Sequence, residues 1–320
     1  RVLQPIQEFE ATSTDEMYDE VRELDWSKIM TVSHTLAVDC NVRSSKITHS
    51  KYAALRVKDA ICDQFLDRMN KRPSVDVENP RVGLNLHFFK DQATLSLDSS
   101  VQSLHKRGYR GQLHKAALNE ALAATLVLLS GWKGEVPLID PMCGSGTIPI
   151  EAAWMALKRP PGLTRKRFGF QSWLDFDRPL WNRVRDEARE GVLKEMPISI
   201  HGSDHRNDVL RLAEENARAA GIGNHLEFRN QDLFTFAPDS DSGVIICNPP
   251  YGERIGEEDE LRPLYRRLGE LVRANPSWTV WVLSGNARLC QEIGEEPREE
   301  KAIYNGRIPC RFLKFTSNPR

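Results

Sequence analysis

Apolar residues recur along the second half of the chain with two different periods. Short apolar runs rich in β-branched residues predict strands, and apolar residues three or four positions apart predict helices between them. Repeated β-α-β units of this kind predict a parallel sheet covered by helices on both faces. The predicted strands lie at 136–140, 198–204, 225–229, 243–247 and 278–283, and the predicted helices at 148–157, 209–220 and 261–272.

The end of the chain follows a different pattern. Residues 301–304 and 308–315 flank Asn305-Gly306, a pair typical of a tight hairpin turn. We therefore expect the doubly wound sheet to finish in an antiparallel hairpin.

The first half of the chain mixes strand-like runs with one long helical stripe, which indicates a small α+β module. A second stripe starts at Leu113 and stops at Gly131, where glycine is a typical helix end. These patterns predict three parts: a module of residues 1–100, a hinge and linking helix of residues 101–131, and an α/β domain of residues 132–320.

Composition narrows the class of protein. The chain has 320 residues, enough for two domains, and a net charge of −1, so it is not basic as a whole. No apolar run approaches the ~18–20 residues that a membrane span needs. Its six cysteines fall singly, which argues against zinc and disulfides and fits a reducing cytoplasm, with no membrane and no metal. Because Arg1 opens a strand-like run, we expect the natural protein to begin earlier.

Positive charge is nevertheless concentrated locally. The string HKRGYR lies on the predicted hinge and sets cations beside an aromatic ring, a combination typical of nucleic-acid binding. The alternative is a solvated charged face. The candidate RNA contacts in this string are Lys106, Arg107, Tyr109 and Arg110.

A glycine loop follows the first predicted strand of the α/β domain and opens a helix. It lacks the Gly-Lys-Ser/Thr of a phosphate-binding P-loop, and Pro149 stands where a dinucleotide-binding loop needs its third glycine. The acid at its start repels phosphate but suits an ammonium group, which S-adenosylmethionine carries. The candidate cofactor-binding residues of this loop are Asp140, Met142, Cys143, Gly144, Ser145, Gly146 and Thr147.

Acids at two later strand ends match other parts of the same cofactor. Asp204 could accept hydrogen bonds from the ribose hydroxyls and Asp232 from the adenine amino group. The alternatives are a helix N-cap for the first and a turn residue for the second. Residues 159–196, which precede Asp204, form an insertion rich in Arg, Trp and Phe, expected to lie above the sheet.

The string Asn248-Pro249-Pro250-Tyr251 ends the apolar run 243–247, so it is expected in a loop at the carboxyl end of a buried strand. A nucleobase amine is a poor nucleophile until acceptors hold its two N–H bonds. The Asn248 amide oxygen and the Pro249 carbonyl are predicted to be those acceptors, with Asn248 also beside the cofactor, and Tyr251 to stack on the base. The alternative is an ordinary Asn-Pro turn with a buried tyrosine.

These strings together resemble those of the bacterial guanine-N2 methyltransferases of large-subunit ribosomal RNA. The matching strings are DPMCGSGT, GSD, NQD and NPPYGER, preceded by HKRGYR. The resemblance implies a Rossmann-like class I methyltransferase that uses S-adenosylmethionine, joined to an amino-terminal THUMP domain that binds RNA and is incomplete at its start. It implies 23S ribosomal RNA as the partner, and in close relatives a fusion to a second methyltransferase. Just beyond the motif, Arg254 is a candidate RNA contact, or an ion-pair partner of Glu253.

Two rival functions remain open from the sequence. The NPPY string is shared with adenine-N6 DNA methylases and glutamine methyltransferases, so it specifies an amino acceptor and not a particular base. A chain with the same fold could also be a non-catalytic RNA-binding factor of ribosome assembly. Cys247 and Cys143 are interpreted as buried or loop residues and not as nucleophiles.

Overall fold

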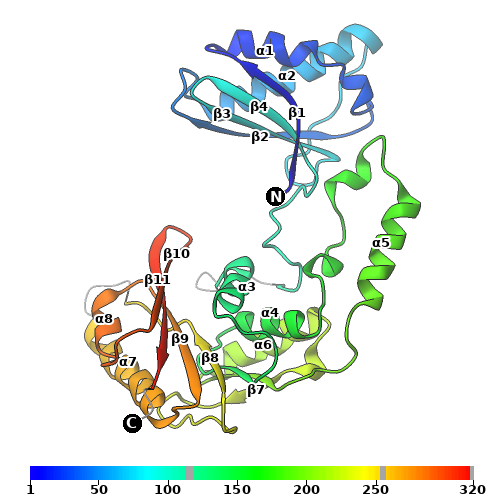
Figure 1. Ribbon diagram of the computed structural model, residues 1–320. Coiled ribbons are helices and arrows are strands. Elements are labelled where there is room, and N and C mark those ends of the chain that lie inside the picture. The colour runs from blue at the N-terminus through cyan, green and yellow to red at the C-terminus, as the bar shows by residue number, and fades with distance from the viewer. Residues whose placement is uncertain (112–117, 253–256, 318–320) are drawn as a thin grey trace. The chain divides into compact units, whose positions relative to one another are not determined.

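The computed structural model describes residues 1–111, 118–252 and 257–317, which fall into two compact units (Figure 1). Unit 1 contains Arg1–Lys106 and Lys166–Arg183, and unit 2 contains Arg107–Arg165 and Val184–Arg320. Each unit encloses its own apolar core. Within the described ranges, every helix is too short or too polar to traverse a lipid bilayer.

Unit 1 is built on a four-stranded sheet with the order β1-β4-β3-β2. The pair β2 and β3 is parallel and the other pairs are antiparallel. Lys90 and Asp91 both have positive φ in the two-residue turn between β3 and β4, as a tight hairpin turn requires. The elements are β1 (Leu3–Glu10), α1 (Thr14–Glu23), η1 (Trp26–Lys28), β2 (Leu36–Arg43), α2 (Ser50–Met69), β3 (Val82–Phe89) and β4 (Gln92–Asp98).

The middle of the predicted insertion belongs to unit 1. The 3-10 helix η3 (Gly169–Ser172) begins where the Gly169 amide donates to the Ser99 carbonyl over 2.7 Å. A Cβ on Gly169 would come within 2.3 Å of the Asp98 carbonyl oxygen, so only glycine allows this approach. Residues 166–183 of the expected insertion therefore belong to unit 1 and not to the unit that holds the α/β sheet.

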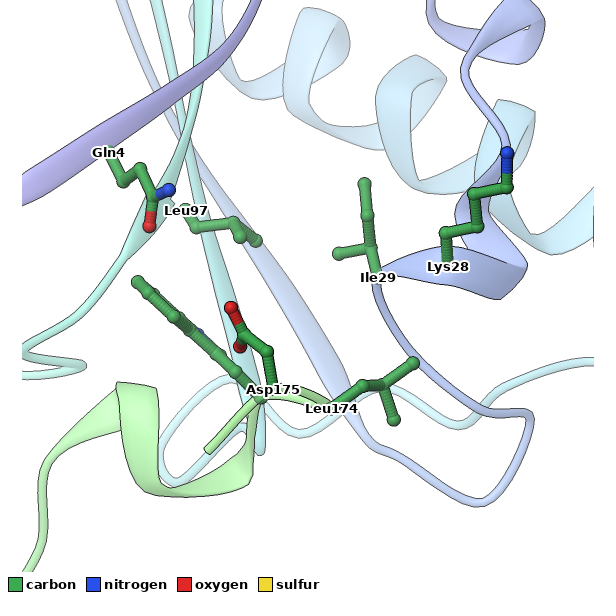
Figure 2. Close-up of a pocket in the computed structure, with 7 residues that line it drawn as sticks. Gln4, Lys28, Ile29, Leu97, Leu174 and Asp175 are labelled. Carbon is green, nitrogen blue, oxygen red and sulfur yellow. The ribbon is translucent and has the colours of Figure 1, made fainter. Parts of the chain in front are cut away.

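This segment also lines one side of a small open cavity within unit 1. The cavity has a volume of about 360 Å³. Figure 2 shows Gln4 and Ile29 on opposite sides of it, with the Asp175 carboxylate between them. Its lining residues are Gln4, Lys28, Ile29, Leu97, Trp173, Leu174 and Asp175.

Unit 2 is a seven-stranded sheet with the order β10-β11-β9-β8-β5-β6-β7. Strands β7, β6, β5, β8 and β9 are parallel, and β11 runs antiparallel between β9 and β10. The predicted α/β class and terminal hairpin are both confirmed. The strands are β5 (Leu138–Asp140), β6 (Ile200–Asp204), β7 (Glu227–Asn230), β8 (Gly243–Cys247), β9 (Trp278–Ser284), β10 (Glu299–Asn305) and β11 (Ile308–Thr316).

Helices cover both faces of this sheet. One buried cluster joins it to α3, α4 and α6, and the other joins it to α7 and α8. Asn119 caps α3 by accepting from the Ala121 and Leu122 amides, so this helix starts seven positions later than the predicted stripe, whose first part lies outside the described residues. The helices of unit 2 are α3 (Glu120–Leu129), α4 (Thr147–Ala156), η2 (Pro161–Thr164), α6 (Asn207–Ala219), η4 (Gly223–His225), α7 (Glu257–Ala274) and α8 (Ala287–Gln291). The helix α5 (Arg178–Glu190) begins in unit 1, ends in unit 2 and has no buried residue.

Candidate active site

The two strings singled out in the sequence leave neighbouring strands at the same edge of the sheet. Strands β5 and β8 pair in parallel, with Leu138 opposite Val244 and Ile139 opposite Ile245. The chain order reverses between these strands, and such a switch point is where open α/β sheets bind ligands. The glycine loop after β5 and the Asn248–Tyr251 loop after β8 are therefore brought together although they lie about 100 residues apart.

The glycine loop is tied to the next strand along the sheet. The Gly144 amide donates to Asp204 Oδ2 over 3.0 Å, and the Cys143 amide donates to the Ser203 carbonyl over 2.9 Å. The loop is also anchored from α6, where Asn216 Nδ2 donates to the Ser145 carbonyl over 3.0 Å. Burial raises the pKa of the Cys143 thiol well above its usual range, which suits a packed loop residue.

Its two glycines have different uses. Gly146 caps α4 with φ of +78°, and a Cβ there would lie 3.0 Å from Ala213 and Phe228. Gly144 also has positive φ, +51°, but an added Cβ would meet nothing within 4 Å. Gly146 thus permits close packing, whereas Gly144 leaves open space against which a ligand can lie.

Asp140 is a buried carboxyl group at the root of this loop. It is 2% exposed, and its Oδ1 accepts from the Met142 amide over 3.1 Å. Burial raises its pKa to about 8; the Met142 hydrogen bond lowers it and the nearby Asp204 carboxylate raises it. A cationic ligand would favour the charged form of Asp140. The site thus fits a ligand with an ammonium group better than one with a phosphate.

The other two predicted cofactor acids lie along the same edge. Asp204 ends β6, and its Oδ1 accepts from the Arg206 amide over 3.0 Å. Asp232 lies just beyond β7, is exposed, and accepts from the Phe234 amide over 2.9 Å. The turn geometry considered for Asp232 is thus present, and its position at the strand end leaves it available to a ligand as well.

The Asn248–Tyr251 loop is held by neutral hydrogen bonds. The Tyr251 hydroxyl donates to Asn248 Oδ1, and burial raises the pKa of Tyr251, so this hydroxyl remains a donor. From α7, the Tyr265 hydroxyl donates to the Pro250 carbonyl over 3.1 Å. From the loop after β9, Asn286 Nδ2 donates to the Tyr251 carbonyl over 3.1 Å.

Sequence reasoning missed Tyr265, Ser284 and Asn286. The Tyr265 hydroxyl also meets Ser284 Oγ at 3.0 Å, and Asn286 Oδ1 caps α8 by accepting from the Arg288 and Leu289 amides. Tyr265 falls within the apolar stripe of a helix, so the pattern assigned it to the core. An asparagine just after a strand and a glycine is an N-cap signal that could have drawn attention to Asn286.

Three side chains of the HKRGYR string, those of Arg107, Tyr109 and Arg110, are mostly enclosed in unit 2. Tyr109 is 2% exposed, and the Arg110 side chain is 7% exposed and lies 3.7 Å from Glu120. Arg107 lies 3.4 Å from Glu151. The prediction for Tyr109 and Arg110 is corrected, because side chains enclosed beside carboxylates do not face a phosphate backbone. Of the other candidates, Lys106 is exposed in unit 1, and Arg254 lies outside the described residues.

These buried charges support the helix that the glycine loop opens. Arg110 hydrogen-bonds to Thr147 Oγ1 at the first residue of α4, and the Tyr109 hydroxyl donates to Glu151 over 3.2 Å one turn later. Burial raises the pKa of Glu151 to about 7, although Arg107 and Tyr109 lower it. The string is thus part of the scaffold behind the candidate site.

Comparison with known proteins agrees with this architecture. Residues 107–314 match the family described as RMKL-like, methyltransferase domain, and residues 11–98 match the THUMP domain. The chain belongs to the RMKL-like methyltransferase family. A ribosomal RNA large subunit methyltransferase K/L from Syntrophotalea carbinolica is 47% identical over 328 residues. That match covers 98% of this chain and 46% of the relative, so the chain spans about half the length of this relative.

Solved structures share the fold of this RMKL-like methyltransferase over its whole length. A possible methylase from Clostridium difficile 630 has a TM-score of 0.90 at 33% identity, covering 100% of this chain and 85% of its own. The protein SMU.472, solved as a complex with SAH, has a TM-score of 0.88 at 29% identity. The match covers 99% of this chain and 84% of SMU.472.

Proposed function

We propose that unit 2 transfers a methyl group from S-adenosylmethionine to the exocyclic N2 amine of a guanine in 23S ribosomal RNA. The observation that carries this proposal is the meeting of the glycine loop and the Asn248–Tyr251 loop at the adjoining ends of β5 and β8. One loop offers a buried acid and open backbone, and the other offers amide and carbonyl acceptors, so donor and acceptor chemistry lie side by side.

The cofactor would be held by the acids along the sheet edge. Asp140 would take the ammonium group, Asp204 the ribose hydroxyls and Asp232 the adenine amine. The open space at Gly144 supports close contact of a ligand with the backbone. When bound, S-adenosylmethionine supplies a methyl group on a positively charged sulfur, so the leaving group is already activated. The SAH bound to SMU.472, which shares this fold, supports the assignment.

The acceptor base would be held by the second loop. Asn248 Oδ1 and the Pro249 carbonyl would accept the two N–H bonds of the guanine amine and direct its lone pair toward the methyl group. Tyr251 would support the unstacked base. The amine loses one proton to solvent once the new N–C bond forms, so no strong base is needed. Holding two reactants in an aligned geometry can supply roughly 7–11 kcal/mol of the barrier.

Ribosomal RNA as the substrate is supported by the THUMP domain and by the name of the K/L relative. The part of that relative which this chain does not match leaves room for a second methyltransferase acting with it. The choice of guanine N2 over adenine N6 is part of the proposal, because the NPPY string suits either amine.

The test is methylation of unmodified 23S ribosomal RNA with isotopically labelled S-adenosylmethionine, followed by mass spectrometry of the nucleosides. The expected product is labelled N2-methylguanosine, absent when Asn248→Ala replaces the wild type. Labelled N6-methyladenosine would instead support the adenine-N6 alternative and contradict guanine N2 as the acceptor. RNA binding without any labelled nucleoside would favour the non-catalytic alternative.

A further inference from the structure

The hairpin β10–β11 extends past the edge of the sheet at which the candidate site lies. Strand β11 pairs with β9 only from Arg311, opposite Ser284 at the carboxyl end of β9. The preceding residues 308–310 and their partners 303–305 on β10 continue beyond that edge (Figure 1). This projecting end, residues 303–310, therefore stands at the same edge as the Asn248–Tyr251 loop.

The inner face of the projecting end touches Tyr251. A Cβ on Gly285 would lie 2.9 Å from Ile308 Cγ2, 3.2 Å from Tyr251 Cδ2 and 3.5 Å from Cys310 Sγ, so these three side chains converge on one glycine. The Tyr251 hydroxyl also interacts with Asn305 and Cys310. The projecting end is thus a wall of the proposed base site.

Its outer face carries an aromatic ring that the fold does not use. Side chains alternate along a strand, so Tyr304 points away from the face of Asn305 and Ile303. Tyr304 is 69% exposed and lies opposite Pro309, which is exposed too. A large aromatic side chain this exposed adds little to stability, whereas a flat open ring suits a nucleobase.

A cation completes the outer face. Arg307 is exposed in the turn at the tip and makes no ion pair with any residue in the described part of the chain. By contrast, two cations nearer the base of the hairpin are paired with acids: Lys301 with Glu299, and Arg311 with Glu300 at 3.1 Å. The projecting end therefore carries a cation, Arg307, that has no acidic partner among the described residues.

We infer that this projecting end is a wedge that separates the target guanine from the next nucleotide of the RNA. The target base lies on the Tyr251 side, the neighbouring base stacks on Tyr304, and Arg307 pairs with the backbone phosphate between them. Recognition of RNA commonly uses unstacked bases laid on aromatic side chains, which also offsets the cost of unstacking. The inference rests on the proposed function and adds a substrate contact to it.

The experiment compares Tyr304→Ala, Tyr304→Phe and Arg307→Ala with the wild type on a ribosomal RNA substrate. Tyr304→Ala is expected to raise the Kd for RNA and the KM about tenfold, while Tyr304→Phe retains wild-type values. Arg307→Ala is expected to reduce the slope of log Kd against log salt concentration by about 0.7, the value for one phosphate contact on a single strand. The affinity for S-adenosylmethionine and the unfolding midpoint should not change.

Lys301→Ala on the same strand is the matched control, because that lysine is paired with Glu299 nearer the base of the hairpin. Wild-type RNA affinity in both Tyr304→Ala and Arg307→Ala, with a wild type that methylates RNA, would overturn the wedge and leave the proposed function standing. A loss of cofactor affinity in either variant would show that the residue supports the fold, and this result would also overturn the wedge. A wild type that methylates no RNA would overturn both proposals together.

Discussion

The two loops of the candidate site are supported in opposite ways. Behind the glycine loop lie buried ionisable groups, with Arg110 beside Glu120 and Arg107 beside Glu151. Behind the Asn248–Tyr251 loop lie neutral hydroxyl and amide groups, from Tyr265 and Asn286. Buried charged groups attract each other strongly, but their charge changes with pH, and a buried charge without a partner costs free energy. Neutral hydrogen bonds hold their geometry over a wide pH range. We therefore expect cofactor binding to depend on pH. The geometry of the Asn248–Tyr251 loop should not depend on pH.

The largest effect should come from breaking the charged support. Arg110→Ala leaves the Glu120 carboxylate buried without its partner, and we expect a loss of about 3–5 kcal/mol in the free energy of unfolding. Denaturant titration measures this loss. The control is Lys106→Ala, an exposed position in the same string, which should leave the midpoint unchanged. If Arg110→Ala kept wild-type stability but lowered the slope of log Kd for RNA against log salt concentration, Arg110 would be an RNA contact and not part of the scaffold.

A change in the neutral loop should separate chemistry from binding. Asn248→Ala removes the proposed acceptor of the amine protons, and we expect kcat to fall by at least about 100-fold. The affinity for S-adenosylmethionine, measured by calorimetry, should fall little. A variant with near wild-type kcat would remove Asn248 from the chemistry.

The pH dependence of cofactor binding tests the charged loop directly. Because Asp140 has a pKa of about 8, its carboxyl group is mostly protonated at pH 6, and binding an ammonium there must release the proton. Affinity should therefore rise by up to about tenfold per pH unit from pH 6 toward 8. It should fall above that range as the α-amino group of the ligand, with a pKa of about 7.7–8.0, loses its own proton.

Calorimetry in two buffers of different ionisation enthalpy would measure this proton release. In Asp140→Asn the acidic limb should disappear and binding should be weaker throughout. A wild-type affinity that is flat between pH 6 and 8 would contradict the assignment of Asp140 to the ammonium group.

The smallest effect should come from loosening the neutral support without removing it. Asn286→Asp keeps the oxygen that caps α8 but loses the donor to the Tyr251 carbonyl, and it brings a charge beside Glu258. We expect a fall in kcat of about tenfold with cofactor affinity unchanged.

Tyr265→Phe is the companion variant, since it keeps the buried ring and loses only the hydroxyl that holds the Pro250 carbonyl. The kcat profile of Tyr265→Phe should keep the wild-type pH dependence, because this change adds no ionisable group. A loss of cofactor affinity equal to the loss of kcat would instead show that the two loops share one support.

The sequence predicted the sheet and the meeting of the two loops, because strand ends in a parallel sheet collect at one edge. It also predicted the Asn305-Gly306 turn, where a local conformational requirement selects the residues. It did not predict the burial of Arg110, since a run of basic residues looks the same whether its partners are phosphates or, as here, carboxylates supplied by Glu120 and Glu151. Nor could periodicity separate Tyr265 from the apolar residues beside it, because one hydroxyl does not alter the stripe.

The excursion of residues 166–183 into unit 1 has a consequence for anyone dissecting the protein. A THUMP fragment cut out as one continuous stretch would lose Gly169, which packs against Asp98, and Trp173, which packs on its core. It would also lose one wall of the cavity in Figure 2. Domain swaps among relatives should therefore exchange residues 1–106 and 166–183 together, because unit 1 is discontinuous in sequence.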